Sequence, residues 1–264
     1  MDDGGTGVFR VYALHYAHRD AVRGEHFYGY DPCGDRPMPM DYFVWAAASP
    51  RATVVIDAGF TPEVARRRGR IHLASPVDLL AQAGVAAGEV RQVVITHLHY
   101  DHTGYLPAFT AARFIVQEAE MAFWTGRHAG RGEFARLAEP DDIAFLVRAN
   151  LQGRVEQISG DRELAPGLSV HHLGGHTPGL QAVRVRTARG HVVLASDASH
   201  YLANINEDRP FAIVHTLPAM YDAFDRLHEL AGGPGLIVPG HDPAVLGRYA
   251  TTPGAGGGSV VTIA

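Results

Sequence analysis

The sequence has a single cysteine, Cys33, among its 264 residues. One thiol excludes an intrachain disulfide and the zinc sites that are built from several thiolates. Cys33 lies in a stretch rich in glycine, proline and aspartate, residues 28–40, which is typical of a loop. We expect it to play no catalytic role, so any chemistry must come from other side chains.

Long apolar runs and basic stripes are also missing. No apolar segment approaches the roughly 20 residues of a membrane-spanning helix, and the acidic, glycine-rich N-terminal segment lacks the pattern of a signal peptide. The formal net charge is -5. The densest basic run, Arg66 to Arg70, is short and close to Glu63, which favours a solvated helix end. These features predict a cytoplasmic protein that binds neither nucleic acid nor a membrane.

Hydrophobic residues make up 46% of the chain and charged residues 19%, which is typical of one globular domain with a large core. Many short apolar segments alternate with a few helical ones, and this mixture predicts an α/β domain of two sheets covered by helices over residues 1–250. We expect the glycine-rich residues 251–264 to form a flexible tail. The predicted strands are 8–14, 41–48, 52–59, 92–96, 112–117, 167–173, 180–187, 191–197 and 235–240, and the predicted helices are 75–84, 118–126, 141–150 and 217–233.

Histidine is abundant, with 16 residues, and several of them cluster at the ends of predicted strands. The segment THLHYDHTGY, Thr96 to Tyr105, has three histidines and one aspartate within six positions. Three more polar segments, GGHTPG, SD and PGHDP, also follow apolar strands. Loops at strand ends are held by a rigid sheet and are common places for functional sites. The candidate metal ligands in these loops are His97, His99, Asp101, His102, His176, Asp197 and His241.

These seven side chains suit two metal ions. His97 and His99 project to the same side of an extended segment and His102 does not, so the histidines of this loop can be divided between two ions. Imidazole and carboxylate ligands favour zinc and similar divalent ions. Two ions with four ligands each and one shared ligand need seven side chains, and Asp197 is the natural bridge because a carboxylate has two oxygens. The alternative is a polar loop whose histidines are satisfied by ordinary hydrogen bonds.

The motifs HLHYDH, GHTPG, SDAS and GHD, in this order, resemble those of the metallo-β-lactamase superfamily over nearly the whole chain. Within it, the segments MPMDYFVWAAAS, FIVQEAEMAFW and LASDASHY are most similar to the N-acyl-homoserine lactonase branch. The resemblance implies an αββα sandwich, two divalent ions such as zinc, and a small lactone or ester substrate. A homodimer is expected only because dimers are the commonest assemblies. The resemblance also implies that His97, His99 and His176 hold one ion, that Asp101, His102 and His241 hold the other, and that Asp197 bridges them.

The mechanism implied by the resemblance uses a hydroxide that the two ions generate from water, with Asp101 orienting it. In the lactonases a tyrosine three positions after the bridging aspartate helps to polarise the substrate carbonyl. This chain has His200 there, followed by Tyr201. Either His200 takes that role or Tyr201 reaches the site after a small shift, and the alternative is that both side chains simply line the pocket. Since neutral imidazole is the ligating form, activity is expected to fall below about pH 6.

Other functions of the same fold remain open: a thioesterase of the glyoxalase II kind, a β-lactamase, or a non-catalytic member that binds a ligand. We expect His15, His18 and His26 to lie on the surface, with loop contacts at the mouth of the pocket as the alternative. His171 and His172 face opposite sides of a predicted strand, and we expect ordinary packing, with a contact behind a metal ligand as the alternative for one of them. One set of apolar residues is expected either to line a groove for an acyl chain or to belong to the core. It consists of Phe27, Tyr28, Phe109, Met121, Phe123 and Trp124.

Overall fold

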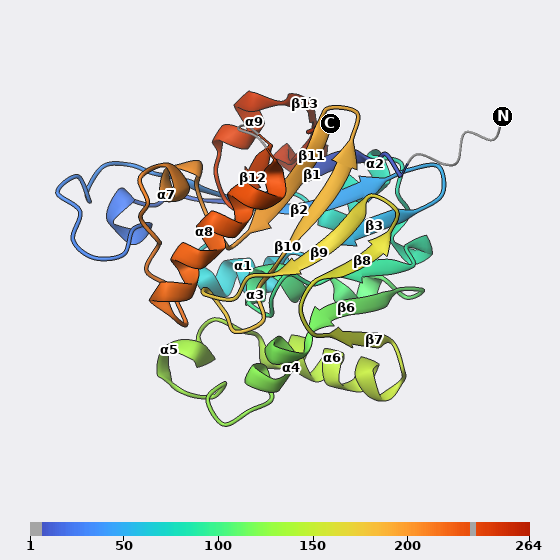
Figure 1. The fold of residues 1–264 in the computed structure, drawn as a ribbon, viewed down its shortest axis with the longest axis horizontal. Helices are drawn as coiled ribbons and strands as arrows, with labels where there is room; N and C mark the ends of the chain where they lie inside the picture. The colour runs from blue at the N-terminus through green and yellow to red at the C-terminus, as the bar shows by residue number, and fades with distance from the viewer. Residues whose placement is uncertain (1–6, 233–235) are drawn as a thin grey trace.

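The computed structural model describes residues 7–232 and 236–264, which form two β-sheets with helices on their outer faces (Figure 1). Within these residues the first sheet has nine strands, in the order β13-β14-β1-β2-β3-β5-β6-β7, with β4 paired to β1. Its strands are β1 (Arg10–Arg19), β2 (Met40–Ala48), β3 (Thr53–Ile56), β4 (Ile71–His72), β5 (Gln92–Val94), β6 (Arg113–Gln117), β7 (Val155–Ile158), β13 (Ala250–Pro253) and β14 (Ser259–Thr262).

The second sheet has the order β12-β11-β10-β9-β8. Its strands are β8 (Arg162–Ala165), β9 (Leu168–His172), β10 (Gln181–Thr187), β11 (Gly190–Ser196) and β12 (Ile237–Pro239). The helices are α1 (Pro62–Arg68), α2 (Pro76–Gln82), α3 (Tyr100–Thr103), α4 (Glu118–Trp124), α5 (Gly132–Ala135), α6 (Pro140–Leu151), α7 (Leu202–Asn206), α8 (Leu217–Ala231) and α9 (Ala244–Arg248). Short 3-10 helices occur at Arg23–Glu25, Ala87–Glu89, Leu106–Ala108 and Ala255–Gly257.

Successive side chains of a buried strand point to opposite faces of its sheet, and both faces contact a hydrophobic core. In β2, Phe43 and Trp45 face the core between the sheets, whereas Tyr42 and Val44 face the core under the helices that cover the first sheet. The outer face of the second sheet packs against α8, which crosses it in Figure 1. A strand buried on both faces reads as a continuous apolar run, which is what the sequence shows. The three cores lie between four successive layers of helices, sheet, sheet and helices, which confirms the predicted αββα sandwich.

Helix boundaries follow local signals in the sequence. Ser75 begins α2 by accepting a hydrogen bond from the Val77 N–H, and Pro76 occupies the first turn, as predicted. The helix α8 ends at Gly232, which adopts the left-handed conformation (φ +64°) that favours glycine. Helix α1, whose last turn contains the basic residues Arg66 to Arg68, also ends at a left-handed glycine, Gly69. No helix within the described ranges combines the length and the apolar character needed to cross a membrane.

The prediction of a flexible tail over residues 251–264 is wrong. Strand β14 pairs antiparallel with β1, from Tyr12 opposite Thr262 to His15 opposite Ser259, and β13 pairs with β14. The side chain of Val261 is buried between the two sheets. The glycines that suggested a tail form the turn between these strands, where the Gly254 N–H donates to the Gly258 carbonyl at 2.7 Å.

Three further strands, β4, β7 and β8, were absent from the sequence prediction. They are short and only partly buried, so their sequences lack a strong apolar pattern. The pairing of β3, β5 and β6 is parallel, as is that of β11 and β12. The carboxyl ends of parallel neighbours lie at one edge of a sheet, and the loops after β3, β5, β11 and β12 carry the polar residues described next.

Candidate metal centre

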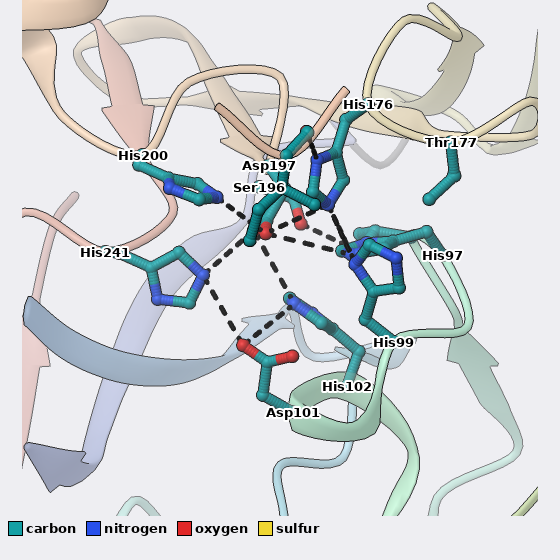
Figure 2. A network of polar contacts seen from close by, with 12 residues as sticks. His97, His99, Asp101, His102, His176, Thr177, Ser196, Asp197, His200 and His241 are labelled. Atoms are coloured by element: carbon teal, nitrogen blue, oxygen red, sulfur yellow. Dashed lines mark hydrogen bonds and ion pairs between the residues drawn. The ribbon is translucent and has the colours of Figure 1, made fainter. Parts of the chain in front are cut away.

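The loops at the carboxyl ends of the strands bring all seven candidate ligands together, and each ligand is buried (Figure 2). His97 and His99 follow β5, and Asp101 and His102 lie on the short helix α3. His176 lies in the loop after β9, Asp197 directly after β11, and His241 after β12. The first sheet therefore supplies four ligands from one segment, and the second sheet supplies three from separate loops.

The first set, which we call the three-histidine group, consists of His97, His99 and His176. The Nε2 atom of His97 lies 3.0 Å from His99 Nδ1 and 3.2 Å from His176 Nε2. The distance between His99 Nδ1 and His176 Nε2 is 2.9 Å. Burial lowers the pKa of all three imidazoles, and neighbouring histidines lower those of His97 and His99 further. All three rings are therefore neutral at physiological pH.

The second set, which we call the mixed group, consists of Asp101, His102 and His241. His102 Nε2 and His241 Nε2 each lie 3.7 Å from Asp101 Oδ2. Burial lowers the pKa of His102, but the carboxylates of Asp57, Asp101 and Asp197 outweigh burial and raise it to about 10. The pKa of His241 is also raised, because Asp197 and Asp101 outweigh burial. The same carboxylates attract any cation at this position.

Asp197 lies between the two groups, and its two oxygens face different sides. Oδ2 is 3.4 Å from His176 Nε2 and 3.7 Å from His97 Nε2. Oδ1 is 3.0 Å from His241 Nε2 and 3.5 Å from His102 Nε2. Gly240 allows this approach, since a Cβ atom there would lie 2.6 Å from the Ser196 carbonyl oxygen and 3.0 Å from Asp197 Oδ1. The carboxylate can thus serve two ions at once.

The outer nitrogens of the histidines show which atoms are free to bind metal. Nδ1 of His176 donates to the Ile213 carbonyl (2.7 Å), and Nδ1 of His241 donates to the Asp41 carbonyl (2.9 Å). Nδ1 of His97 lies 3.2 Å from the Thr96 hydroxyl, which itself donates to Asp57. A neutral ring with its proton on Nδ1 presents an Nε2 lone pair inward, which is how proteins orient histidine ligands.

The residues present fit a pair of divalent ions. Nitrogens held at about 2.0–2.1 Å by a tetrahedral zinc lie roughly 3.3 Å apart, close to the separations in the three-histidine group. Lone pairs that converge in this way repel one another unless a cation lies between them. In the mixed group, His102 Nε2 is buried without a hydrogen-bond partner and faces Asp101 and Asp197. An ion would satisfy this atom.

Residues 38–241 match a family model described as the metallo-beta-lactamase superfamily, which covers most of the chain. The chain belongs to the metallo-β-lactamase superfamily. This confirms the resemblance in the sequence, and the two-sheet fold with ligands at one edge agrees with it.

Several known members of the superfamily are similar to this chain. The N-acyl homoserine lactonase AiiB of Agrobacterium fabrum is 30% identical over 213 residues, or 72% of this chain and 75% of AiiB. The chain spans about half the length of the Bacillus N-acyl homoserine lactonases that it matches.

Solved structures of superfamily members share the fold. The structure of a quorum-quenching N-acyl homoserine lactone lactonase has a TM-score of 0.75 at 22% identity, covering 91% of this chain and 95% of that one. AidC, a dizinc quorum-quenching lactonase in complex with its product N-hexanoyl-L-homoserine, has a TM-score of 0.70 at 16% identity. The AidC comparison covers 96% of this chain and 93% of that chain.

Two buried carboxylates that the sequence analysis did not assign lie behind the ligands of this superfamily member. Asp57 accepts hydrogen bonds from the Thr96 N–H (2.7 Å), the Thr96 hydroxyl (2.8 Å) and His102 Nδ1 (2.7 Å). Its φ of +65° lies in the left-handed region, which aspartate and asparagine tolerate better than most residues. The only sequence signal for Asp57 was its position at the end of a buried strand.

Glu120, on α4, joins the loops that carry the three-histidine group. Oε1 accepts from the Leu98 N–H (2.9 Å) and Trp124 Nε1 (2.7 Å), and Oε2 accepts from the Thr177 hydroxyl (2.7 Å) and the Gly179 N–H (2.8 Å). Burial raises the pKa of Glu120, and these hydrogen bonds to the carboxylate oppose that effect. No sequence pattern distinguished it from the other acidic residues of its helix.

A cavity of about 380 Å³ lies over the centre, and His200 lines it whereas Tyr201 does not. His200 Nε2 is 3.0 Å from Asp197 Oδ2, and its ring stacks on Phe211 with centroids 3.5 Å apart. Burial lowers the pKa of His200 to about 3, so the ring is neutral. The Tyr201 hydroxyl points elsewhere, to the Pro39 carbonyl (3.0 Å) and His26 Nε2 (3.1 Å).

His15 and His26, for which a surface position was favoured over loop contacts at the mouth of the pocket, are both buried. Strand β1 extends further than predicted and carries His15 into the sheet, where its Nε2 lies 3.1 Å from Asp41. His26 lines the cavity and is fixed by the Met38 carbonyl (2.9 Å). His171 and His172 pack ordinarily, as expected, against Asp161 and the Pro178 carbonyl.

The predicted set of apolar residues divides between core and site. Phe27, Phe109 and Met121 are buried in the protein, and Tyr28 is half exposed. Only Phe123 and Trp124 of this set line a smaller cavity of about 210 Å³ next to the centre, which shares His99 and His176 with the larger one.

Proposed function

We propose that this chain is a dinuclear zinc hydrolase that opens the ring of N-acyl homoserine lactones. The observation that carries the proposal is the position of Asp197, whose two oxygens face separate ligand groups at the floor of a cavity. The names of AiiB and the Bacillus relatives support the substrate class.

Zinc is proposed because the ligands are imidazoles and carboxylates without thiolate, and because AidC is described as a dizinc lactonase. When bound, two such ions supply Lewis acidity, which lowers the pKa of water and polarises an ester carbonyl. The chain itself supplies the geometry: Asp57 and the Ile213 and Asp41 carbonyls hold the imidazoles of His102, His176 and His241 in one tautomer.

Asp101 orients the attacking water in this proposal. Its Oδ2 faces His102 and His241, and Tyr16 holds its backbone by donating to the Asp101 carbonyl at 3.1 Å. A carboxylate fixed in this way can accept a hydrogen bond from water and aim its lone pair at the substrate carbonyl.

His200, rather than Tyr201, contacts the substrate in this proposal. It lines the cavity beside Asp197, whereas the Tyr201 hydroxyl is directed to Pro39 and His26. Tyr201 then acts as a positioning residue that fixes the start of α7. We expect His200→Ala to slow ring opening by about 10- to 100-fold, a loss comparable to that of one positioned group. Tyr201→Phe is the matched control and should stay within about threefold of the wild type.

Both variants should be compared at equal metal content, because His200 contacts Asp197. Ring opening can be followed by proton release with a pH indicator. If both variants keep the wild-type rate, neither side chain acts on the substrate.

The acyl chain is proposed to lie in the smaller cavity beside Phe123 and Trp124. Its wall is largely apolar, with Phe134 and Ile213 completing it. Phe123 is partly buried in this wall, and removing its aromatic ring weakens the binding of an apolar chain. The expected result for Phe123→Ala is a higher KM for long acyl chains than for short ones.

One comparison of substrates tests the function as a whole. The zinc-loaded protein is given N-hexanoyl homoserine lactone, a glutathione thioester and nitrocefin under the same conditions. We expect measurable turnover of the lactone only. Turnover of the thioester or nitrocefin alone would replace the lactonase proposal with one of the two other reactions, and binding without turnover would identify a ligand-binding member.

A cytoplasmic location and a homodimer are proposed as well, from the sequence features and from the frequency of twofold assemblies among soluble proteins. Cell fractionation tests the first, and light scattering after size-exclusion chromatography tests the second.

A further inference from the structure

The cavity over the centre has a cationic wall that an uncharged lactone does not explain. Four arginines line it: Arg19, Arg68, Arg70 and Arg136. Glu25, Asp101 and Asp197 are the acidic residues in the same lining, and the last two belong to the candidate metal centre. With divalent ions in place, the cavity attracts anions.

Three of these arginines have carboxylate partners. Arg19 pairs with Glu25, Arg136 pairs with Glu133, and Arg68 Nη2 lies 2.7 Å from Glu139. These pairs compensate most of the positive charge at the cavity wall. Arg70 is the one arginine of the cavity wall for which the described part of the chain supplies no carboxylate in an ion pair.

Arg70 is half-buried, and its protein contacts are uncharged. Its Nε donates to the Tyr100 hydroxyl (3.2 Å) and its Nη1 donates to the Arg68 carbonyl (2.7 Å). Within residues 7–232 and 236–264, no carboxylate lies at ion-pair distance from it, and Nη2 has no hydrogen-bond acceptor. Asp101 attracts Arg70 from beyond ion-pair distance, but it belongs to the candidate metal centre, where bound ions would offset its charge. Arg70 therefore presents a guanidinium at the cavity wall without a carboxylate paired to it directly, and such a group favours an anionic partner.

The position of Arg70 is fixed relative to the centre. Tyr100 lies between His99 and Asp101 in the chain, and its hydroxyl contacts Arg70 and, at 3.5 Å, Tyr42. The guanidinium of Arg68 stacks over the Tyr100 ring at 4.0 Å and holds that ring in place. An anion bound by Arg70 would therefore sit in the same cavity as the reacting ester, at a defined place.

We propose that Arg70 binds a carboxylate on the substrate, so that the preferred substrate is a lactone with an anionic group outside its ring. This inference rests on the proposed lactonase function and narrows its substrate class. Guanidinium presents parallel N–H donors that match the two oxygens of a carboxylate. Arg70 has Nη2 available for this purpose beside the partly used Nη1.

Two homoserine lactones of matched chain length test the proposal. One carries an N-hexanoyl chain, and the other carries an N-adipoyl chain, whose terminal carboxylate would direct the chain toward Arg70 in the larger cavity instead of into the smaller cavity beside Phe123 and Trp124. For the wild type we expect kcat/KM to be at least about tenfold higher for the adipoyl lactone, because a charge-assisted hydrogen bond in a partly buried site supports a difference of that size. The difference should lie mainly in KM.

The variant Arg70→Gln should lose this preference, because its kcat/KM should fall at least about tenfold further for the adipoyl lactone than for the hexanoyl lactone. Arg113→Gln is the matched control, because Arg113 is exposed at the start of β6 and lies outside the cavity. It should retain the full preference. If Arg70→Gln does not fold, Arg70→Lys carries the test, since it keeps the charge but loses the parallel donors, and we expect it to reduce the preference.

Binding of the corresponding lactams, which do not open, gives a readout without turnover. Calorimetry on the zinc-loaded protein should show tighter binding of the adipoyl lactam, and Arg70→Gln should abolish the difference. Since no carboxylate forms from a lactam, this also separates substrate binding from capture of the ring-opened product.

Equal kinetics for the two lactones, or a preference that is unchanged in Arg70→Gln or Arg70→Lys, would overturn the inference and leave the lactonase function intact. Absence of turnover of either lactone would instead overturn the proposed function. In that case equal affinities for the two lactams would overturn the assignment of Arg70 as well.

Discussion

The three-histidine group and the mixed group share Asp197, but the protein supports them differently. Behind the mixed group, Asp57 contacts a ligand directly, through His102 Nδ1. Behind the three-histidine group, Glu120 contacts no ligand side chain directly; it accepts from Trp124 on its own helix and from the loops that carry the ligands, at Leu98, Thr177 and Gly179. One group is thus surrounded by negative charge, and the other consists of neutral rings held by a hydrogen-bonded frame.

This difference indicates two ways to hold a cation. Carboxylates near His102 raise its pKa to about 10 and favour positive charge on electrostatic grounds. In the three-histidine group, burial keeps the rings neutral, and the convergence of their lone pairs provides the affinity. Substitutions that affect one support and spare the other should therefore separate the two groups.

The largest effect is expected for Asp197→Asn, which removes the ligand common to both groups. We expect the metal content to fall from about two equivalents to one or fewer, and ring opening to slow by more than the ~100-fold that is typical for residues outside the ligand set. Elemental analysis and the proton-release assay measure the two effects. Retention of two equivalents would show that the groups do not depend on a shared carboxylate.

Asp57→Asn should weaken the mixed group by about 10- to 100-fold in metal affinity and leave the three-histidine group close to its wild-type affinity, because Asp57 reaches that group only indirectly, through the Thr96 hydroxyl. Asparagine tolerates the positive φ at this position, so the change isolates the charge and the hydrogen bond to His102. A titration against a competing chelator should show one weakened site and one site of wild-type affinity. Equal weakening of both sites would contradict the separation of the groups.

Glu120→Gln should act on the three-histidine side and on stability. An amide places N–H donors against the donors that now point at one carboxylate oxygen, and a buried unpaired donor costs about 1–3 kcal/mol. We expect the free energy of unfolding in urea to fall by that amount. Glu118→Gln, at an exposed position of the same helix, is the control and should have little effect.

Asp142→Asn should give the smallest effect, and one that depends on pH. Asp142 accepts from the Thr103 hydroxyl (2.7 Å) beside the mixed group, and burial raises its pKa to about 6 from a usual value of 3.8. The folded state therefore binds this proton more strongly than the unfolded state, so the charged carboxylate destabilises the fold at neutral pH.

We expect the Asp142→Asn variant to be more stable than the wild type at pH 8, by about 1 kcal/mol after allowance for partial exposure. The difference should shrink as the pH falls through about 6 toward 4, where the wild-type carboxyl is protonated. Urea unfolding at several pH values measures this. A difference that does not change with pH would assign the effect to the Thr103 hydrogen bond.

The sequence predicted the parts of the molecule that depend on local signals. The ligand loops were predictable because each combines an apolar strand with polar residues or glycine directly after it, and the structure brings all seven side chains together. Helix α2 was predictable because Ser75 and Pro76 act within one turn. Buried strands such as β5 and β11 were found for the same reason.

Features that depend on distant parts of the chain were not predicted. Asp57 is 45 residues from His102, and Glu120 is 57 residues from Thr177, so no local pattern reveals either contact. Glycines at 254–258 suggested a tail because the partner of β14 is β1, at the other end of the described chain. Adjacent residues such as His200 and Tyr201 can face either way until the surrounding loops are known, and the structure places only His200 at the cavity.

The cavity wall and the ligand loops come largely from different segments. Glu25 and His26 belong to the connection between β1 and β2, which lies beside α7 in Figure 1, and Arg136 and Leu137 lie between α5 and α6. Because these connections contribute none of the seven ligands, they can be exchanged or evolve new sequences without disturbing the reactive centre. Exchanging those two connections between relatives is therefore a route to new substrate preferences while the seven ligands and their loops stay the same.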